Sequence, residues 1–458
     1  MSIASHQAES EEALEPYLPP RFTLASSEPL DIPLEAIVAE VQEVFAPIEC
    51  ELTGFGPLLT QAIYALLTGE NLLVFSPPGT AKTLFARLLF RRISGARVFD
   101  TQLSKGTLAE ELFGSVDIEQ MKTGRVIHNT RGTLVDADLA FIDEFFDAND
   151  MVLRALLGIF HERVFKKGSQ TQPASLHTGI AAANYVRATG VTQAVVDRFL
   201  FRATIAPAYD PFTLLSIDHA FARHHGDCAA SDSSSAADER RLPLAHLTYL
   251  KEIVSGRVPE HQITAPPHVL FMKNVLINRY RHLMAQHRVA TDSDEPAPYI
   301  SPRTYAKSRV LLNAAALLRG HRQVTCDDLS QLKYVITTIG GDPEESRSFD
   351  DALRWTLMTI RDAEREQVDR LAAAEQLAEQ ILHRFRTGER ISCTRFLQRL
   401  LRLFGLISEG DVTFDHVRRF VEDVKPRVDE VKLLKQGLIG RLQEFKNRVD
   451  YHQGYLIH

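Results

Sequence analysis

The sequence predicts an α/β domain built on a parallel sheet, followed by an α-helical lid and a C-terminal all-α domain. Between Asn71 and Phe90 an apolar strand, a Pro/Gly loop and a helix follow one another, and the apolar run Leu139 to Ile142 is typical of a strand buried on both faces of a parallel sheet. After residue 345, apolar residues recur at three and four positions, which predicts packed helices. The expected divisions are an arm at 1–30, the α/β domain at 31–211, the lid at 212–344 and the C-terminal domain at 345–458.

Length and composition indicate a globular protein with several domains. The 458 residues are 45% hydrophobic, which is ample for a core, and the formal net charge of -7 argues mildly against nucleic acid as the main partner. The sequence has no run of about eighteen apolar residues, and its acidic N-terminal stretch is unlike a signal peptide. We therefore expect a cytoplasmic protein without an integral membrane segment. The four cysteines lie far apart, which indicates neither a zinc site nor a disulfide framework.

The segment Asn71 to Phe90 has the features of a phosphate-binding P-loop. A strand that ends in a Pro/Gly turn before a helix gathers backbone N–H groups and the positive end of the helix dipole around one point. Lys82 begins the helix and puts an ammonium near the β and γ phosphates, and the Thr83 hydroxyl beside it can bind Mg²⁺. The usual pattern has glycine where this chain has Ser76 and Ala81, so each replacement adds a Cβ where the freedom of glycine is normally used.

Polar residues follow two further apolar strands. Asp143 and Glu144 come at the end of the strand Leu139 to Ile142, and Asn184 follows Ile180 to Ala183. Because α/β sheets bind ligands at the carboxyl ends of their strands, we expect these side chains to lie beside the P-loop.

The remaining elements are predicted by the same periodicities and by turn residues between them. The expected helices are 34–45, 56–68, 108–112, 150–162, 302–318 and 326–338, and the further strands are 97–102 and 203–205. Hairpins are expected around 122–125 and over 164–179, and low-complexity loops over 226–241 and 290–298. Lys166 and Lys167 at the second hairpin tip could grip an acidic polypeptide or nucleic acid, or form an ordinary solvated turn.

Five motifs, SPPGTAKT, FIDE, AAAN, VVDRF and SPR, occur in the order and on the elements in which this chain resembles the AAA+ ATPases. The MoxR branch is most similar, because it tolerates Ala before the P-loop Lys and carries an insertion before the acidic strand, as at Gly114 to Asp138. Within it, LFGSVDIEQMKTGR and FHERVFKKG resemble the RavA-like regulatory ATPases. The resemblance covers roughly residues 34–340.

The resemblance implies an ATPase that uses ATP and Mg²⁺. The nucleotide-binding residues it implies are Pro78, Gly79, Thr80, Ala81, Lys82, Thr83 and Leu84. Thr83 and Asp143 would hold the metal, and Glu144 would activate the attacking water. Asn184 would act as sensor 1, and Arg303, at the start of a lid helix, would act as sensor 2.

Arg198 resembles the arginine finger, which acts on the nucleotide of a neighbouring subunit, although Arg202 lies close enough in sequence to be the finger instead. A site shared in this way needs a ring, and the resemblance implies a homo-hexamer. It also implies remodelling or activation of client proteins, commonly with a partner that carries a von Willebrand factor A domain, driven by rotation of the lid against the α/β domain. A nucleic-acid-stimulated motor and a nucleotide-regulated scaffold with little turnover are the alternatives. The sequence predicts neither the client nor the role of residues 345–458.

Overall fold

The computed structural model describes residues 32–122, 126–168, 170–185, 195–206, 210–227, 240–291, 300–387 and 413–456 of the chain. The arm expected at 1–30 lies outside the described residues. The same is true of the hairpin tip at 123–125 and of most of the low-complexity loops at 226–241 and 290–298.

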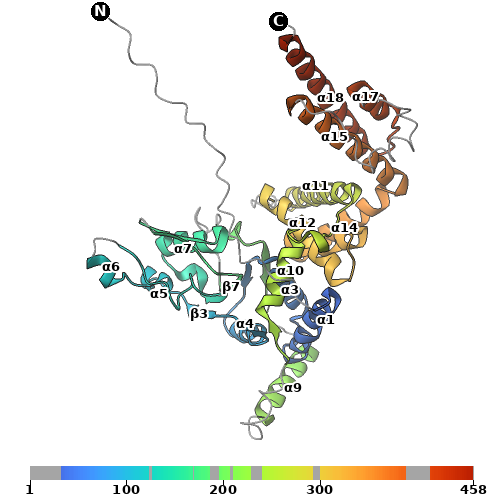
Figure 1. Cartoon of the computed structure of the whole chain (residues 1–458). Coiled ribbons are helices and arrows are strands. Elements are labelled where there is room, and N and C mark those ends of the chain that lie inside the picture. Colours follow the sequence, from blue (N-terminus) through green and yellow to red (C-terminus); the bar gives the residue numbers. More distant parts are fainter. Residues whose placement is uncertain are drawn as a thin grey trace, which may run out of the picture.

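A five-stranded parallel sheet forms the centre of the N-terminal part of the molecule (Figure 1), as the sequence predicts. Its strands lie in the order β3-β4-β7-β1-β8, and every neighbouring pair is parallel. The strands are β1 (Leu72–Phe75), β3 (Val98–Gln102), β4 (Leu139–Asp143), β7 (Thr178–Ala183) and β8 (Phe201–Thr204). Since β4, β7 and β1 are neighbours, the segments that follow them meet at one edge of the sheet.

Alternate residues of β1 point into two different hydrophobic cores. Leu72 packs on one face with α1 (Leu34–Phe45) and α3 (Gly56–Thr68), whereas Leu73 packs on the other face with α7 (Asp150–Leu157). Helices therefore cover both faces of the sheet, which is why this strand is a continuous apolar run. The bounds of α1, α3 and β1 are those expected from the sequence.

The two expected hairpins have different outcomes. The second is confirmed as the antiparallel pair β5 (Val164–Lys167) and β6 (Gln170–Pro173), but it is shorter than expected because residues 178 and 179 begin β7. The first is confirmed in part: its flanking segments pair in an antiparallel manner, but helix α6 (Ile118–Lys122) stands before the expected turn. A single antiparallel bridge between residues 116 and 128 closes that insertion. The shorter elements are α2 (Pro47–Glu51), α5 (Ala109–Phe113), β2 (Ile93–Ser94) and β9 (Leu242–Pro243).

The helical lid shares a core with one face of the sheet. Its helices are α10 (Leu244–Val254), α11 (Pro267–Ala290), α12 (Pro302–Leu318), α13 (Lys333–Ile336) and α14 (Pro343–Thr359). Leu250, Leu311 and Phe349 of these helices belong to the same cluster of buried residues as Leu72 of β1. Helix α9 (Pro211–Asp227), which follows β8, projects away from the rest of the molecule (Figure 1).

The C-terminal helices have a core of their own. These helices are α15 (Asp362–Thr387), α17 (Phe414–Asp423) and α18 (Asp429–Leu456), and they bury residues such as Leu371 and Val421 against one another. The boundary expected at 345 falls inside α14, whose Phe349 packs in the lid. The division into domains stays a prediction, and the packing favours a boundary near Ile360.

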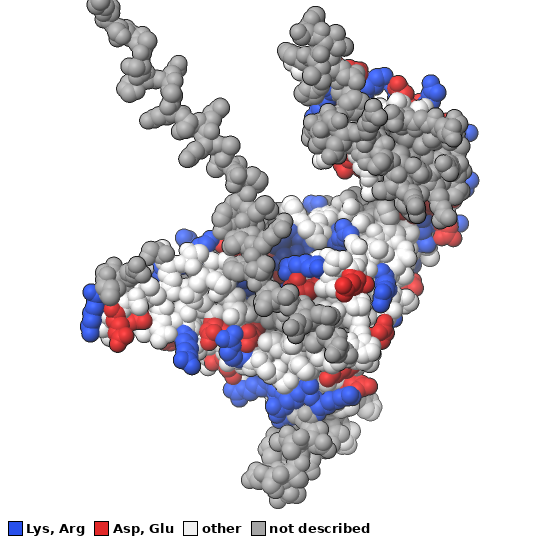
Figure 2. All heavy atoms as spheres, in the orientation of Figure 1, with Lys and Arg blue, Asp and Glu red and all other residues white. Residues whose placement is uncertain are grey.

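Basic and acidic side chains are interspersed over the face shown in Figure 2, with a band of basic residues near the base of α9. Within the described ranges, every helix is too short or too polar to cross a membrane.

Candidate nucleotide-binding site

The loop between β1 and α4 (Lys82–Arg91) is closed without the first glycine of the usual P-loop. Ser76 is buried, and its hydroxyl is hydrogen-bonded to Thr80 Oγ1 and donates to the Pro77 carbonyl oxygen at 3.2 Å. Gly79 and Ala81 both have left-handed backbones, with φ of 81° and 59°. The loop therefore keeps the backbone turn that two glycines would allow, at the cost of strain at one alanine.

Lys82 and Asn184 meet at the mouth of this loop. The Lys82 ammonium donates hydrogen bonds to the Ser76 carbonyl oxygen at 3.2 Å and to Asn184 Oδ1. Because β1 and β7 are adjacent, the helix that starts at Lys82 and the segment that follows β7 place these two side chains in contact. A lysine held by neutral oxygens keeps its positive charge available to an anion.

Asp143 and Glu144 lie across from α4. Asp143 Oδ2 accepts from the Thr83 hydroxyl at 3.4 Å, and Oδ1 accepts from the Glu144 backbone N–H at 2.8 Å. Glu144 has a left-handed backbone with φ of 49° and ψ of 41°. For a residue with a Cβ this conformation is strained, and such strain persists where the surrounding structure imposes it. The buried rings of Phe145 and Phe146 directly after it anchor the turn.

One cavity of about 270 Å³ collects these side chains. Its lining residues are Pro78, Gly79, Thr80, Ala81, Lys82, Thr83, Asp143, Glu144 and Asn184. The ammonium and the N-terminus of α4 suit phosphate, and the hydroxyl and carboxylate 3.4 Å apart are the hard oxygen ligands that Mg²⁺ prefers. Leu84, which is 45% exposed on the first turn of α4, is not among the residues that line the cavity.

Arg303 lies at the other end of the sheet. Its Nη1 is 3.9 Å from Asp197 Oδ2, and Lys307 one turn later forms an ion pair with Glu70 at 2.5 Å. Glu70 precedes β1, whereas the P-loop follows it, and four residues of strand span about 13 Å at ~3.3 Å per residue. Arg303 is therefore separated from the cavity of its own chain by the length of the sheet.

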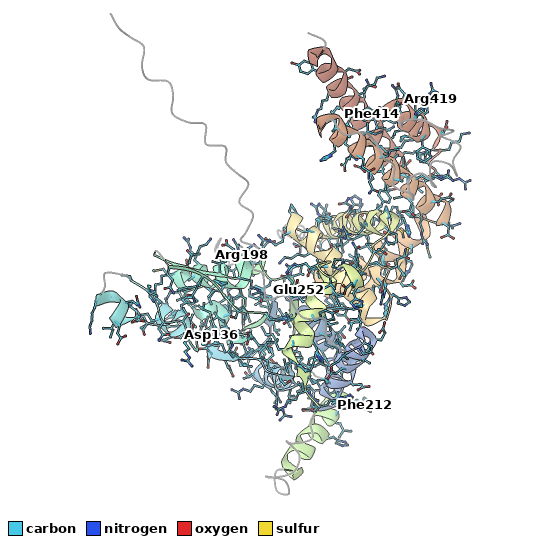
Figure 3. All side chains as sticks on the ribbon, viewed as in Figure 1. Asp136, Arg198, Phe212, Glu252, Phe414 and Arg419 are labelled. Carbon is cyan, nitrogen blue, oxygen red and sulfur yellow. The ribbon has the colours of Figure 1, made fainter. Side chains whose placement is uncertain are left out.

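Arg198 lies at the same end of the sheet as Arg303, because it comes before strand β8. It lies three residues before β8, and Figure 3 places it on the opposite side of the α/β part from Phe212, which lies beyond the carboxyl end of β8. The alternative, Arg202, lies within β8, near enough to Glu345 of α14 for its charge to act on that carboxyl group. Burial raises the pKa of Glu345, and the charge of Arg202 partly offsets this effect. Arg198 and Arg202 are both half-buried, so their exposure does not decide between them, and the choice of Arg198 as the finger stays a prediction.

The fold and the cavity define an α/β P-loop nucleotide-binding domain. Residues 39–217 match the family model described as the MoxR domain in the MoxR-vWA-beta-propeller ternary systems. This segment is therefore MoxR-like, as the motifs indicate, whereas the RavA-like branch stays a prediction.

The chain is also similar to a solved structure and to curated proteins. A crystal structure of a candidate ATPase from Cytophaga hutchinsonii is similar over 70% of this chain and 95% of its own, with a TM-score of 0.53 and 18% identity, which shows that the two chains share a fold. The uncharacterized protein MJ0079 of Methanocaldococcus jannaschii is 25% identical over 275 residues, or 60% of this chain and 64% of that protein. Structural protein ORF618 of Acidianus two-tailed virus is 25% identical over 303 residues, or 63% of this chain and 47% of that protein. The chain thus matches about half to two thirds of the length of these two curated relatives.

Proposed function

We propose that the chain is an ATPase of the MoxR type that hydrolyses ATP to ADP and phosphate. The observation that carries this proposal is the convergence of the P-loop, the acidic pair and Asn184 on one cavity at the carboxyl edge of the sheet. Three polar groups that phosphoryl transfer needs, a cation, a metal-binding oxygen pair and a second carboxylate, face the same space there.

Five polar residues of the cavity have a defined part in this proposal. Lys82 binds the β and γ phosphates, and Asn184 exchanges its bond to Lys82 for one to the γ-phosphate or the water. Thr83 and Asp143 hold Mg²⁺, which supplies positive charge to the phosphate oxygens when bound. The Glu144 carboxylate accepts a proton from the attacking water, and its constrained backbone fixes the direction of the side chain.

Arg198 and Arg303 serve the nucleotide of a neighbouring copy in this proposal. Both lie at the end of the sheet away from the cavity, where Arg303 is close to Asp197, so neither is placed to reach its own nucleotide. Contacts between the two opposite ends of identical chains are head-to-tail, and such contacts form a ring where the rotation from copy to copy closes. We propose a homo-hexamer, the state that the family resemblance implies.

The wider role that we propose is remodelling of a client protein in the cytoplasm together with a von Willebrand factor A domain partner. Its support is the match of residues 39–217 to a domain of MoxR-vWA systems. The hairpin tip adds little support for either kind of client, protein or nucleic acid. Lys166, which would bind an acidic partner there, is already paired with Glu162 at 3.2 Å.

The ATPase proposal is tested by comparing turnover of the parent chain with Lys82→Ala, Glu144→Gln and the control Glu260→Gln, an exposed acid far from the cavity in sequence. We expect the first two to lose about 10²–10⁴-fold in turnover and the control to match the parent. Equal rates for Glu144→Gln and the parent would falsify the assignment.

The shared site is tested by mixing two inactive chains. Lys82→Ala keeps an intact Arg198, and Arg198→Ala keeps an intact cavity, so their mixture should regain activity that neither has alone. Unchanged activity of the mixture would contradict a site shared between copies.

A further inference from the structure

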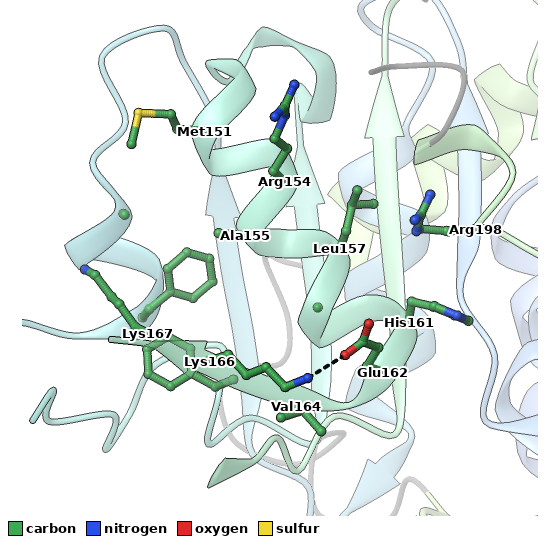
Figure 4. Close-up of a pocket in the computed structure, with 14 residues that line it drawn as sticks. Met151, Arg154, Ala155, Leu157, His161, Glu162, Val164, Lys166, Lys167 and Arg198 are labelled. Carbon is green, nitrogen blue, oxygen red and sulfur yellow. Dashed lines mark hydrogen bonds and ion pairs between the residues drawn. The ribbon is translucent and has the colours of Figure 1, made fainter. Parts of the chain in front are cut away.

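A second cavity, of about 500 Å³, lies between α5, α7, the turn that follows α7 and strand β5 (Figure 4). Its wall combines apolar side chains such as Phe113 with the cations of Arg154 and Lys167. In Figure 4, His161 and Arg198 lie together on the side of the cavity away from the hairpin lysines. The cavity thus brings a histidine with no assigned role beside the proposed arginine finger.

The backbone around His161 is held in an uncommon conformation. Residues Gly158–Glu162 form a π-helical turn, and Arg163 directly after it has a left-handed backbone with φ of 56°. Such turns occur frequently at functional sites. Distant groups hold this one in place, because the Asn71 amide donates to the Phe160 carbonyl oxygen at 2.6 Å and Arg163 donates to the Gly69 carbonyl oxygen at 2.8 Å.

Four charged groups act on the His161 ring. Arg303 and Lys307 come from α12, Arg198 from the segment before β8, and Glu70 from the segment before β1. Burial, reinforced by the three cations, lowers the pKa of His161 to about 4. At neutral pH the ring is therefore uncharged and carries one N–H donor.

Two polar atoms of this cluster have unused hydrogen-bonding capacity. His161 Nδ1 and Arg303 Nη1 are both buried, and neither has a hydrogen-bond partner in the part of the chain that the structure describes. The nearby carboxylates do not meet this need: Glu70 is paired with Lys307, and Asp197 is 3.9 Å from Arg303. Buried polar groups are normally hydrogen-bonded, and because both atoms are enclosed in the single chain, an outside anion meets this need only where contact with a neighbouring copy uncovers them.

We propose that His161 is a further trans-acting residue, which donates a hydrogen bond from Nδ1 to the γ-phosphate of the neighbouring copy's nucleotide beside Arg198 and Arg303. This inference rests on the proposed function and adds a neutral donor to its two arginines. A terminal phosphate has three strong acceptor oxygens, which suffice for two guanidinium groups and one imidazole. A neutral ring among three cations adds a donor without further like-charge repulsion.

Three variants of the full chain test the donor. In His161→Asn the amide N–H can replace the Nδ1–H, whereas His161→Leu has no donor and Arg154→Gln changes another residue of the same cavity. We expect kcat to fall by about 10–10²-fold in His161→Leu and by less than about fivefold in the Asn and Arg154 variants. Binding of a fluorescent ATP analogue and the melting temperature should match the parent in all three. Equal kcat for the Leu variant and the parent, or equal losses in Leu and Asn, would overturn the role.

Sedimentation of the variants in ATP and in ADP distinguishes two contacts of His161: one with the γ-phosphate of the neighbouring copy's nucleotide, and one with a carboxylate of the neighbouring chain. Loss of assembly in His161→Leu in ATP alone is expected for a γ-phosphate contact. Equal loss with both nucleotides would instead indicate a carboxylate of the neighbouring chain and would overturn the proposal.

Mixing distinguishes failure of this inference from failure of the proposed function. Lys82→Ala supplies an intact His161 to the nucleotide held by His161→Leu, so the mixture should regain activity. If Lys82→Ala restores Arg198→Ala but not His161→Leu, the role of His161 is wrong and the shared site stands. If it restores neither variant, both proposals fail.

Discussion

Three residues other than glycine have left-handed backbones in the described part of the chain, and all three lie at the proposed sites. They are Ala81 in the P-loop, Glu144 in the acidic pair and Arg163 after the π-helical turn. Each such conformation costs on the order of 1–3 kcal/mol and persists where other contacts require it. Only the strain at Ala81 could be predicted from the sequence, because the P-loop pattern normally has glycine at that position.

The strain at Ala81 predicts a stability difference. Ala81→Gly should raise the free energy of unfolding by about 0.5–1 kcal/mol, because the left-handed penalty exceeds the entropy that glycine adds to the unfolded chain. Gly79→Ala, at φ of 81° with open space around the added Cβ, should lower it by about 1–2 kcal/mol. Urea unfolding measures both, and a lower stability for Ala81→Gly than for the parent would contradict the argument.

Among the elements, those with local signals were predictable. Helix α3 begins with Pro at its first turn and ends at Gly69 with φ of 65°, and α12 begins where Ser301 accepts a hydrogen bond from the Thr304 N–H. The carboxyl-edge site was also predictable, since Asp143 ends a buried strand of one parallel sheet and Lys82 and Asn184 follow two others.

Elements that depend on distant contacts were not predictable. The π-helical turn depends on Arg163 reaching Gly69, 94 positions away. The place of Arg303 depends on how the lid attaches to the sheet, where Ile339 pairs with Ala203 of the edge strand β8. A sequence pattern carries no signal for either contact, so the end of the sheet at which Arg303 lies could not be inferred.

The attachment at β8 depends on a glycine. Gly340 has φ of 71°, and an added Cβ would lie 2.2 Å from the Thr204 carbonyl oxygen. We expect Gly340→Ala to lower the free energy of unfolding by about 2–4 kcal/mol, because the backbone must move and the bridge to β8 is lost. The control Gly320→Ala has a similar φ of 74° and open space, and should lose only about 1–2 kcal/mol. Chemical denaturation of the two variants compares them, and equal losses would show that the close approach to β8 is unimportant.

For the whole molecule, the shared core bears on how ATP hydrolysis could produce motion. The buried Gln61 amide of α3 donates to the carbonyl oxygens of Arg202 in β8, at 3.0 Å, and Tyr334 in the lid, at 2.8 Å. The expected rotation of the lid against the α/β domain would break these bonds and open a continuous core. The rotation of the lid stays a prediction. The packing instead favours a motion in which whole copies move against one another at the proposed shared site.

The C-terminal helices attach to the rest of the molecule differently. Their buried residues pack mainly among themselves, and α15 meets α11 through polar contacts such as His268 Nδ1 to Asp369 Oδ2 at 2.8 Å, with Phe271 partly buried beside them. Half-exposed polar contacts of this kind contribute little to stability. The last lid residue with a fully buried side chain before α15 is Ile360.

A chain that ends after Ile360 should therefore fold as the parent does. We expect it to unfold cooperatively, to bind the fluorescent ATP analogue within about threefold of the parent affinity, and to keep ATP-dependent assembly, because the cavity, Arg198 and Arg303 all lie before that point. Calorimetry, nucleotide titration and sedimentation measure these properties. The matched control is a chain that ends after Leu332, inside the shared core, and it should fail to fold.

If the chain ending at Ile360 also unfolds or aggregates, the C-terminal helices are part of the fold of the ATPase domain. If it folds and hydrolyses ATP, the role of these helices lies in contacts beyond hydrolysis.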